Sequence, residues 1–224
     1  MESFRILFAY NSGKIENEAI KYYDTREIFE NGKIISFTGD IRTIFELQNQ
    51  KDCYEFLKYK IIEREKLSVD LVKKVHYELT KNTYDERRYA ENAELPGEFK
   101  KHSYIVGINE VGSEADEVES DIQVLLDDIN DYSSNDNDRD ILKVGAFFHA
   151  NFENIHPFAD GNGRVGRTLS NYYLMINNHP PFIIYEEDKI KYYEALQVFD
   201  ETLKLDDLYN FLIEQCIKTW DRQK

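Results

Sequence analysis

The chain has 224 residues, of which 42% are hydrophobic and 14% aromatic, and its formal net charge is −15. This composition excludes disordered and collagen-like chains, and 10 Gly with 4 Pro argue against a linker-rich or many-turned β architecture. The negative charge argues against nucleic acid and anionic membranes as partners, and no apolar run approaches the roughly 18 residues that a membrane span requires.

Helical periodicity dominates the predicted elements. Apolar residues three and four apart predict one helix near 54–62 and another over 71–79, with Ser68 as its cap. Only residues 97–109 are predicted to be extended, because β-branched and aromatic residues between glycines are typical of a short hairpin. Further helices are expected at 118–129, 141–155, 162–177, 192–203 and 205–220, with a loop at 132–139. The predicted fold class is an all-α bundle with a small β-hairpin flap.

The N-terminal residues, the cysteine count and the charge distribution give two further expectations. The first residues lack the basic and long apolar parts of a signal peptide, and two cysteines are too few for a secreted disulfide framework, so we expect a cytoplasmic protein. Residues 114–140 contain eleven acidic residues and a single arginine. The simpler interpretation of this run is a solvated helix face and loop, and the alternative is an acidic docking surface for a basic partner.

The segment HPFADGNGRVGR at 156–167 combines glycines and arginines at the predicted start of a helix. Gly161 and Gly163 would leave backbone N–H groups free to point at one spot, where the helix dipole also favours an anion. Arg164 and Arg167, three residues apart, can project from one helix face, and their guanidinium groups suit phosphate oxygens. The pattern predicts a phosphate-binding loop.

Two other residues of this segment suggest chemistry beside the phosphates. Asp160 is a hard carboxylate of the kind that a Mg²⁺ ion escorting a di- or triphosphate needs. His156 is the candidate base, because it is the group here that titrates near neutrality. A rival interpretation is a zinc site, because His149, Glu153 and His156 fall on one helix face. A histidine in the core is the simpler interpretation of His149.

Residues 156–167 match without a gap the signature HPFx(D/E)GNGRxxR, and in these residues the chain resembles Fic-domain proteins. Members of this family are mostly helical AMP-transferases that move AMP from ATP, with Mg²⁺, to a Ser, Thr or Tyr hydroxyl of a target protein. The resemblance extends from the N-terminal segment to the helix at Tyr192. It implies an N-terminal helical segment over 1–66, a Fic core with flap and nucleotide loop over 67–205, and a C-terminal helix over 206–224.

The resemblance implies roles for the residues of the loop. His156 would deprotonate the target hydroxyl, Phe158 would anchor the loop, and Asp160 would bind Mg²⁺. Gly161, Asn162 and Gly163 would form an anion hole. Arg164 and Arg167 would hold the phosphates. This is the adenylylating form of the signature, whereas Doc-type kinases carry a lysine-containing variant.

The resemblance also implies two borders of the nucleotide site. Tyr192 and Tyr193 are similar to a tyrosine pair beside the adenine, although the asparagine expected eight residues after Tyr192 is Asp200 here. The flap would lie over the nucleotide and hold an extended target segment by strand pairing. The flap residues implied are Val106, Gly107, Ile108 and Asn109.

Residues 12–17, SGKIEN, resemble the inhibitory motif [S/T]xxxE[G/N] of self-inhibited, class II-like members, with Ser12, Glu16 and Asn17 at its fixed positions. Glu16 would pair with Arg167 and occupy the donor meant for the γ-phosphate. The simpler interpretation of this spacing is an ordinary helix start. A similar fragment at 43–47 departs from the motif at both ends, and we expect it to be plain helix.

Several alternatives remain open from the sequence. Glu16 could instead align water to remove AMP from a modified target, which would make the chain a deadenylylase. A non-catalytic Fic-fold module that binds partners through the acidic run is a second alternative, and transfer of another nucleotide, such as UMP, is a third. The resemblance also allows a homo-oligomer that regulates inhibition. The target protein is not identified by the sequence.

Overall fold

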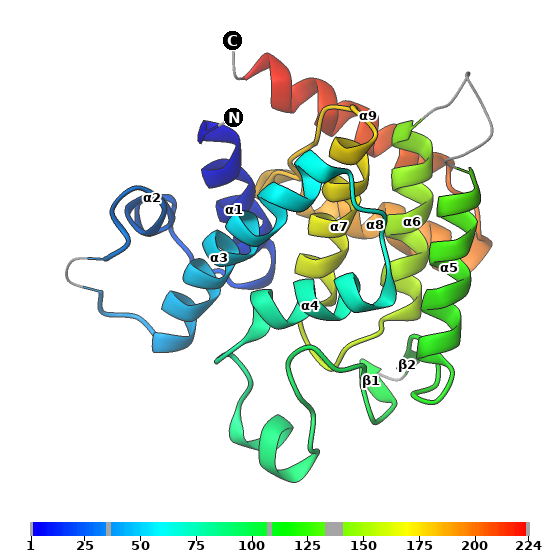
Figure 1. Cartoon of the computed structure of the whole chain (residues 1–224), viewed down its shortest axis with the longest axis horizontal. Helices are drawn as coiled ribbons and strands as arrows, with labels where there is room; N and C mark the ends of the chain where they lie inside the picture. The colour runs from blue at the N-terminus through cyan, green and yellow to red at the C-terminus, as the bar shows by residue number, and fades with distance from the viewer. Residues whose placement is uncertain (1, 35–36, 107–108, 133–140, 223–224) are drawn as a thin grey trace.

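The computed structural model describes residues 2–34, 37–106, 109–132 and 141–222. These residues form a helical bundle, and the predicted all-α fold is confirmed (Figure 1). The helices in chain order are α1 (Glu2–Glu16), α2 (Tyr22–Asn31), α3 (Ile41–Glu63), α4 (Val69–Thr80), α5 (Val118–Tyr132), α6 (Ile141–Ile155), α7 (Asn162–Ile176), α8 (Lys189–Thr202) and α9 (Asp206–Asp221). A π-helical turn spans Arg87–Glu91 and a 3-10 turn spans Glu186–Asp188.

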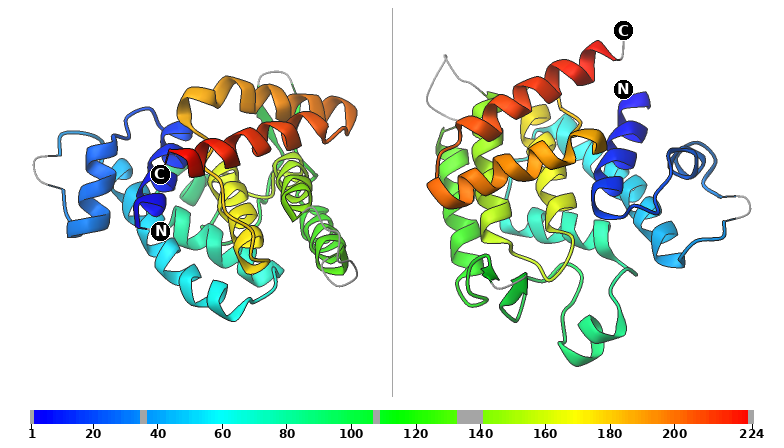
Figure 2. Two further views of the ribbon diagram at one scale, coloured as in Figure 1. Left: turned by 90° about the horizontal axis from the view of Figure 1, so that it is seen from above. Right: turned by 180° about the vertical axis from the view of Figure 1, so that it is seen from behind.

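Helices α6 and α7 share the most extensive packing in the bundle, and their facing side chains form the centre of the core. Phe148 and Phe152 of α6 and Leu169 of α7 are fully buried there. Helix α4 and the end of α1 pack against α7, while α5 and α9 pack against α6. Helices α8 and α9 run side by side across the back of the bundle (Figure 2).

The N-terminal helices α1, α2 and α3 pack on one another and share a separate apolar cluster beside the main core (Figure 1). The buried members of this cluster are Ile6, Ala9, Ile20, Ile28, Phe29 and Leu47. Helix α3 also packs on α4, which Ser68 caps as predicted by accepting the Leu71 N–H at 3.2 Å.

Helix α3 begins well before the helix predicted at 54–62. Residues 48–52 in its middle include no apolar side chain, and Asn49 and Gln50 are buried there, so the apolar periodicity that signals a helix is interrupted before residue 54. Asp40 starts the helix by accepting the Arg42 N–H at 2.9 Å. The fragment at 43–47 is plain helix, as expected.

Two short strands, β1 (Tyr104–Val106) and β2 (Asn109–Val111), pair antiparallel with Tyr104 opposite Val111. The predicted bounds of the hairpin, 97–109, were therefore wrong. The residues before β1 are not paired in a sheet, because the Lys100 N–H donates instead to the Pro157 carbonyl at 2.9 Å. Gly107 and Ile108 of the predicted flap lie outside the described residues.

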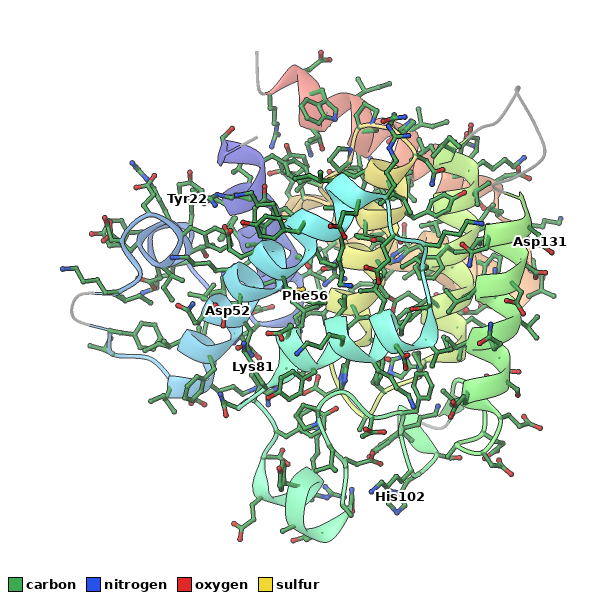
Figure 3. All side chains as sticks on the ribbon, viewed as in Figure 1. Tyr22, Asp52, Phe56, Lys81, His102 and Asp131 are labelled. Atoms are coloured by element: carbon green, nitrogen blue, oxygen red, sulfur yellow. The ribbon has the colours of Figure 1, made fainter. Side chains whose placement is uncertain are left out.

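Acidic side chains line the outer face of α5, and Asp131 is labelled there in Figure 3. The loop predicted at 132–139 lies outside the described residues except for Tyr132, which ends α5. The docking role of this acidic run stays a prediction. Among the helices of the described ranges, none has the length and apolar character that crossing a membrane would require.

Candidate functional site

The loop between α6 and α7 is held in place by its own side chains. Phe158 is fully buried, as the anchoring role implies, and it stacks on the ring of His76 with centroids 3.7 Å apart. The Asn162 side chain closes the loop: its Oδ1 accepts the Phe158 N–H at 2.9 Å, and its Nδ2 donates to the Phe158 carbonyl at 2.8 Å. Both polar atoms of the Asn162 side chain therefore bond within the loop, and only the backbone N–H of Asn162 can bind a ligand.

His76 of α4, which the sequence analysis did not single out, supports this loop from below. Its Nδ1 accepts the Gly97 N–H at 2.8 Å, so the ring proton lies on Nε2, which donates to the Asp160 carbonyl at 3.0 Å. Burial lowers the pKa of His76 to about 3. His76 is therefore a neutral histidine that fixes the backbone at Asp160.

The start of α7 presents unused donors. Gly161 caps the helix in the left-handed conformation, at φ +86, and provides no side-chain acceptor for the first-turn N–H groups. Nη1 of Arg167 and both Nε and Nη1 of Arg164 are buried nitrogens without a hydrogen-bond partner in the described part of the chain, although Nη1 of Arg164 lies 3.6 Å from Glu46 Oε1. Buried guanidinium donors without hydrogen bonds beside an uncapped helix start are suited to bind an anion such as phosphate.

The N-terminal motif reaches this anion site. Arg167, 1% exposed, donates from Nη2 to Glu16 Oε1 at 2.8 Å. It also donates to Ser12, from Nε to the hydroxyl at 3.1 Å and from Nη2 to the carbonyl at 2.9 Å. Burial alone would lower the pKa of Arg167, but the charge of Glu16, the nearby Tyr192 and Glu153, and the hydrogen bond to Glu16 together outweigh it and raise this pKa. We call this set of contacts of Ser12 and Glu16 with Arg167 the latch.

The motif lies at the end of α1, not at a helix start. Glu16 is the last residue of α1, and Asn17 follows it. The Asn17 Nδ2 donates to Glu46 Oε2 at 2.7 Å and to Thr43 Oγ1 at 3.2 Å, both on α3. The structure therefore brings Ser12 and Glu16 to Arg167, whereas Asn17 joins the end of α1 to α3.

Asp160 lies among three arginines. Its Oδ2 is 2.8 Å from Nη2 of Arg42 and 3.9 Å from Nη2 of Arg88, and its Oδ1 is 3.5 Å from Nη2 of Arg164. Burial alone would raise the pKa of Asp160, but the guanidinium groups of Arg164, Arg42 and Arg88 outweigh it and lower this pKa. The carboxylate is therefore ionised and 20% exposed.

The Asp160 carboxylate fits a metal site whose other ligands come from a bound phosphate and water. No group of three His, Cys, Asp or Glu side chains able to hold a metal occurs within the described ranges. A lone carboxylate suits a Mg²⁺ ion whose other ligands are phosphate oxygens and water. The His149, Glu153 and His156 set predicted as the rival zinc site is not such a group. His149 is fully buried, with Nε2 2.8 Å from the Tyr192 hydroxyl, so it belongs to the core.

His156 follows the last residue of α6, in a left-handed conformation at φ +50. The backbone on both sides of it is bonded to the segments that flank the hairpin, because Lys100 N–H donates to the Pro157 carbonyl and Ser113 N–H to the Ile155 carbonyl, each at 2.9 Å. Burial, followed by the charge of Lys100, lowers the pKa of His156 to about 4. The imidazole is therefore neutral at pH 7 and able to accept a proton.

Glu94, another residue that the sequence analysis did not single out, anchors the chain before the hairpin. This buried carboxylate accepts the Lys101 N–H and the Tyr104 hydroxyl, the latter at 2.8 Å, and lies 3.1 Å from Nδ1 of His102. Figure 3 shows His102 at the edge of the molecule near the strands. These contacts keep the base of the hairpin beside His156.

The two tyrosines predicted beside the adenine occupy different surroundings. Tyr192 is 1% exposed and lies behind Arg167, whose guanidinium carbon is 5.9 Å from the ring centroid. Tyr193 is 41% exposed, and its ring centroid lies 5.1 Å from that of Tyr192. Asp200, in place of the expected asparagine, accepts a hydrogen bond from Asn154 at 2.9 Å. Of the pair, only Tyr193 offers substantial surface to a base.

Comparisons with known proteins agree with this fold. Residues 66–174 match the Fic/DOC family. A protein of Caenorhabditis briggsae named protein adenylyltransferase fic-1 is 28% identical over 201 residues, which are 88% of this chain and 37% of that protein. A protein of Aedes aegypti named protein adenylyltransferase Fic is 47% identical over 60 residues, or 27% of this chain and 12% of that protein. The chain thus spans little more than a third of the nematode relative.

Solved structures show the same arrangement of helices. A Fic domain containing signaling protein from Bacteroides thetaiotaomicron superposes with a TM-score of 0.81 at 23% identity, covering 97% of this chain and 85% of that one. Fic-1 from Caenorhabditis elegans superposes with a TM-score of 0.80 at 24% identity, covering 99% of this chain and 63% of that one. Residues 66–174 of the chain are a Fic domain.

Proposed function

We propose that this protein is an adenylyltransferase that moves AMP from ATP to a Ser, Thr or Tyr hydroxyl of a target protein, and that the latch restrains it. One observation carries the proposal: unpartnered N–H donors of Arg164 and Arg167 lie at the uncapped start of α7, and the neutral His156 precedes them in the same loop. The names of the relatives, protein adenylyltransferases, support the same reaction.

In the proposed reaction, His156 accepts the proton of the target hydroxyl. The hydroxyl oxygen forms a bond to the α-phosphorus of ATP while the bond from that phosphorus to the oxygen bridging to the β-phosphate breaks, and pyrophosphate leaves. Arg164, Arg167 and the first-turn N–H groups of α7 would hold the phosphate oxygens in line for this attack. Tyr193 is the residue that we assign to the adenine border, and Tyr192 supports Arg167 from behind.

Asp160 is the residue that would hold Mg²⁺. The ion would supply charge neutralisation for the phosphates when it is bound. The chain's own contribution is an ionised carboxylate, which His76 fixes through the Asp160 carbonyl.

The latch explains why the enzyme would be restrained. Glu16 and Ser12 take three of the hydrogen bonds that Arg167 can donate, so this guanidinium cannot bind a γ-phosphate fully while α1 is in place. The strands β1 and β2 are the proposed site at which an extended target segment pairs, next to His156.

The test is AMP transfer from ATP, measured as an added AMP mass on the protein itself or on lysate proteins. We expect Glu16→Gly to raise labelling strongly, because it releases Arg167, and Glu16→Gly/His156→Ala to abolish it. Glu18→Gly is the matched control, because Glu18 is an exposed neighbour outside the latch. Equal labelling by the wild type and Glu16→Gly would contradict the latch. No labelling from ATP or any other nucleoside triphosphate would favour a non-catalytic binding module.

Removal of AMP is a second candidate, because Glu16 lies at the anion site with 34% of its side chain exposed, so water can reach its carboxylate. In that case a target labelled by Glu16→Gly would lose AMP when wild-type protein is added. Competition by UTP against ATP distinguishes AMP transfer from UMP transfer.

A further inference from the structure

The carboxylate of Asp160 already has a strong partner from a distant helix. Arg42, in the first turn of α3 and 118 positions earlier in the chain, donates from Nη2 to Asp160 Oδ2 at 2.8 Å. The other two arginines lie farther from this carboxylate, at 3.5 Å and 3.9 Å. Arg42 is therefore the group that most directly occupies the oxygen that a cation would need.

Arg42 is held in this position by Glu46, one turn later on α3. Glu46 is buried, and its Oε1 accepts from Nε of Arg42 at 3.1 Å. Its Oε2 accepts from Asn17, the last fixed residue of the inhibitory motif, at 2.7 Å. Glu46 Oε1 also lies 3.6 Å from Nη1 of Arg164, farther than from Arg42. Glu46 thus joins the end of α1 to the arginine that contacts Asp160 most closely.

A guanidinium and a divalent cation compete for the same carboxylate oxygen, because their like charges repel. Arg42 is the most exposed of the arginines around Asp160, with 36% of its side chain exposed against 29% for Arg88 and 4% for Arg164, so it can move away most easily. Entry of a cation at Oδ2 would therefore displace Arg42 toward solvent. The contact is a competitor for the metal and not a support for it.

We propose that Arg42 competes with Mg²⁺ for Asp160 and thereby weakens binding of Mg-ATP, with Glu46 as the positioning residue that keeps Arg42 in place. This inference rests on the proposed function, because it takes Asp160 as the residue that holds Mg²⁺. The contact between Arg42 and Asp160 would be a second restraint beside the latch. It comes from α3 and acts on metal binding.

The experiment measures binding of α,β-methylene-ATP by calorimetry in the Glu16→Gly background, where Arg167 is free for phosphates. This analogue cannot release AMP, because carbon replaces the oxygen that bridges the α- and β-phosphates. We expect Arg42→Gln to lower the Kd of the Mg²⁺ complex about threefold to fivefold, in the range for a partly exposed ion pair, and not to lower the Kd measured in EDTA. Arg26→Gln is the matched control, because Arg26 forms an i,i+4 pair with Glu30 on α2, as Arg42 does with Glu46.

An unchanged or raised Kd of the Mg²⁺ complex in Arg42→Gln would overturn the inference. The role of Glu46 has its own test: Glu46→Gln should lower the same Kd but not the Kd in EDTA, and should add little once Arg42 is already glutamine. An equal fall of the Kd in EDTA would show that Glu46 acts through Arg164, which it also contacts, and would overturn the positioning role. Additive effects would overturn the positioning role. Tight binding without AMP transfer by the Glu16→Gly protein would contradict the proposed function alone, whereas failure of that protein to bind the Mg²⁺ complex would contradict both.

Discussion

The carboxylate of Glu16 lies directly against the backbone of Gly163, so that a β-carbon at residue 163 would overlap Glu16 Oε1 and lie 2.9 Å from Nη1 of Arg167. The latch therefore closes without displacement only over a glycine. We predict that Gly163→Ala lowers the free energy of unfolding by about 1 kcal/mol, the low end of the usual cost of overpacking, because both overlapped atoms end flexible side chains. The loss should be smaller in the Glu16→Gly background, because one of the two overlaps is gone. Urea denaturation of the four proteins measures this coupling, and additive losses would contradict it.

An anion should replace Glu16 at Arg167. In Glu16→Gly the buried guanidinium loses its charged partner, so inorganic triphosphate should raise the melting temperature of this variant more than that of the wild type. A ligand at one hundred times its Kd stabilises the folded protein by about 2.7 kcal/mol. Thermal unfolding with and without triphosphate, at matched ionic strength, measures the effect. Glu16→Gly/Arg167→Ala should lose it, and an equal gain in the wild type would argue against the latch.

Lys189, the first residue of α8, stabilises the closed end of α1. Its Nζ donates to the Ile15 carbonyl at 2.6 Å, where a helix end leaves carbonyls unpaired and favours positive charge. We predict that Lys189→Ala weakens the latch by about 1 kcal/mol and increases AMP transfer about fivefold. The measurement is the initial rate of labelling by otherwise wild-type protein. Lys191→Ala, an exposed lysine of the same helix, is the control and should leave the rate unchanged.

The buried titratable groups predict loss of stability in acid. Burial lowers the pKa of His76 and His149 to about 3 and that of His156 to about 4, so below pH 6.5 the unfolded chain binds three protons that the folded chain does not. Glu153 opposes this by one proton between pH 4.5 and 8, because burial raises its pKa to about 8. The free energy of unfolding should therefore fall by roughly 2.7 kcal/mol per pH unit between pH 6 and 5.

Urea unfolding at closely spaced pH values measures this slope. His156→Asn should reduce it by about one proton, or roughly 1.4 kcal/mol per pH unit. A slope that His156→Asn leaves unchanged would show that this histidine is protonated alike in both states.

The nucleotide loop could be predicted because its residues are consecutive. Gly161, Arg164 and Arg167 form a pattern within seven consecutive residues, and this pattern predicts the start of a helix. The apolar helices α4 to α9 were predictable for a similar reason, because their buried positions recur at helical spacing.

The supporting residues could not be predicted, because each is a single polar side chain on a helix distant in sequence. His76 and Glu46 lie on buried helix faces that otherwise carry no chemical pattern, and Arg42 contacts Asp160 only through the folded arrangement of α3. The sequence also could not separate Tyr192 from Tyr193, since either aromatic ring can face a core. The predicted bounds of the hairpin were wrong for a comparable reason. The backbone N–H of Lys100 bonds to the Pro157 carbonyl instead of a neighbouring strand, and no pattern of residues in the sequence indicates this bond.

The small apolar cluster of α1, α2 and α3 is separate from the core that contains α6 and α7. Substitutions at Ile20, Ile28 or Phe29 can therefore change how firmly the end of α1 is seated while the packing around His156 stays intact. Ile15, next to Glu16, packs in the main core, so the end of α1 is seated in both interiors. Selection could still adjust the resting activity gradually through the smaller cluster, without rebuilding the main core.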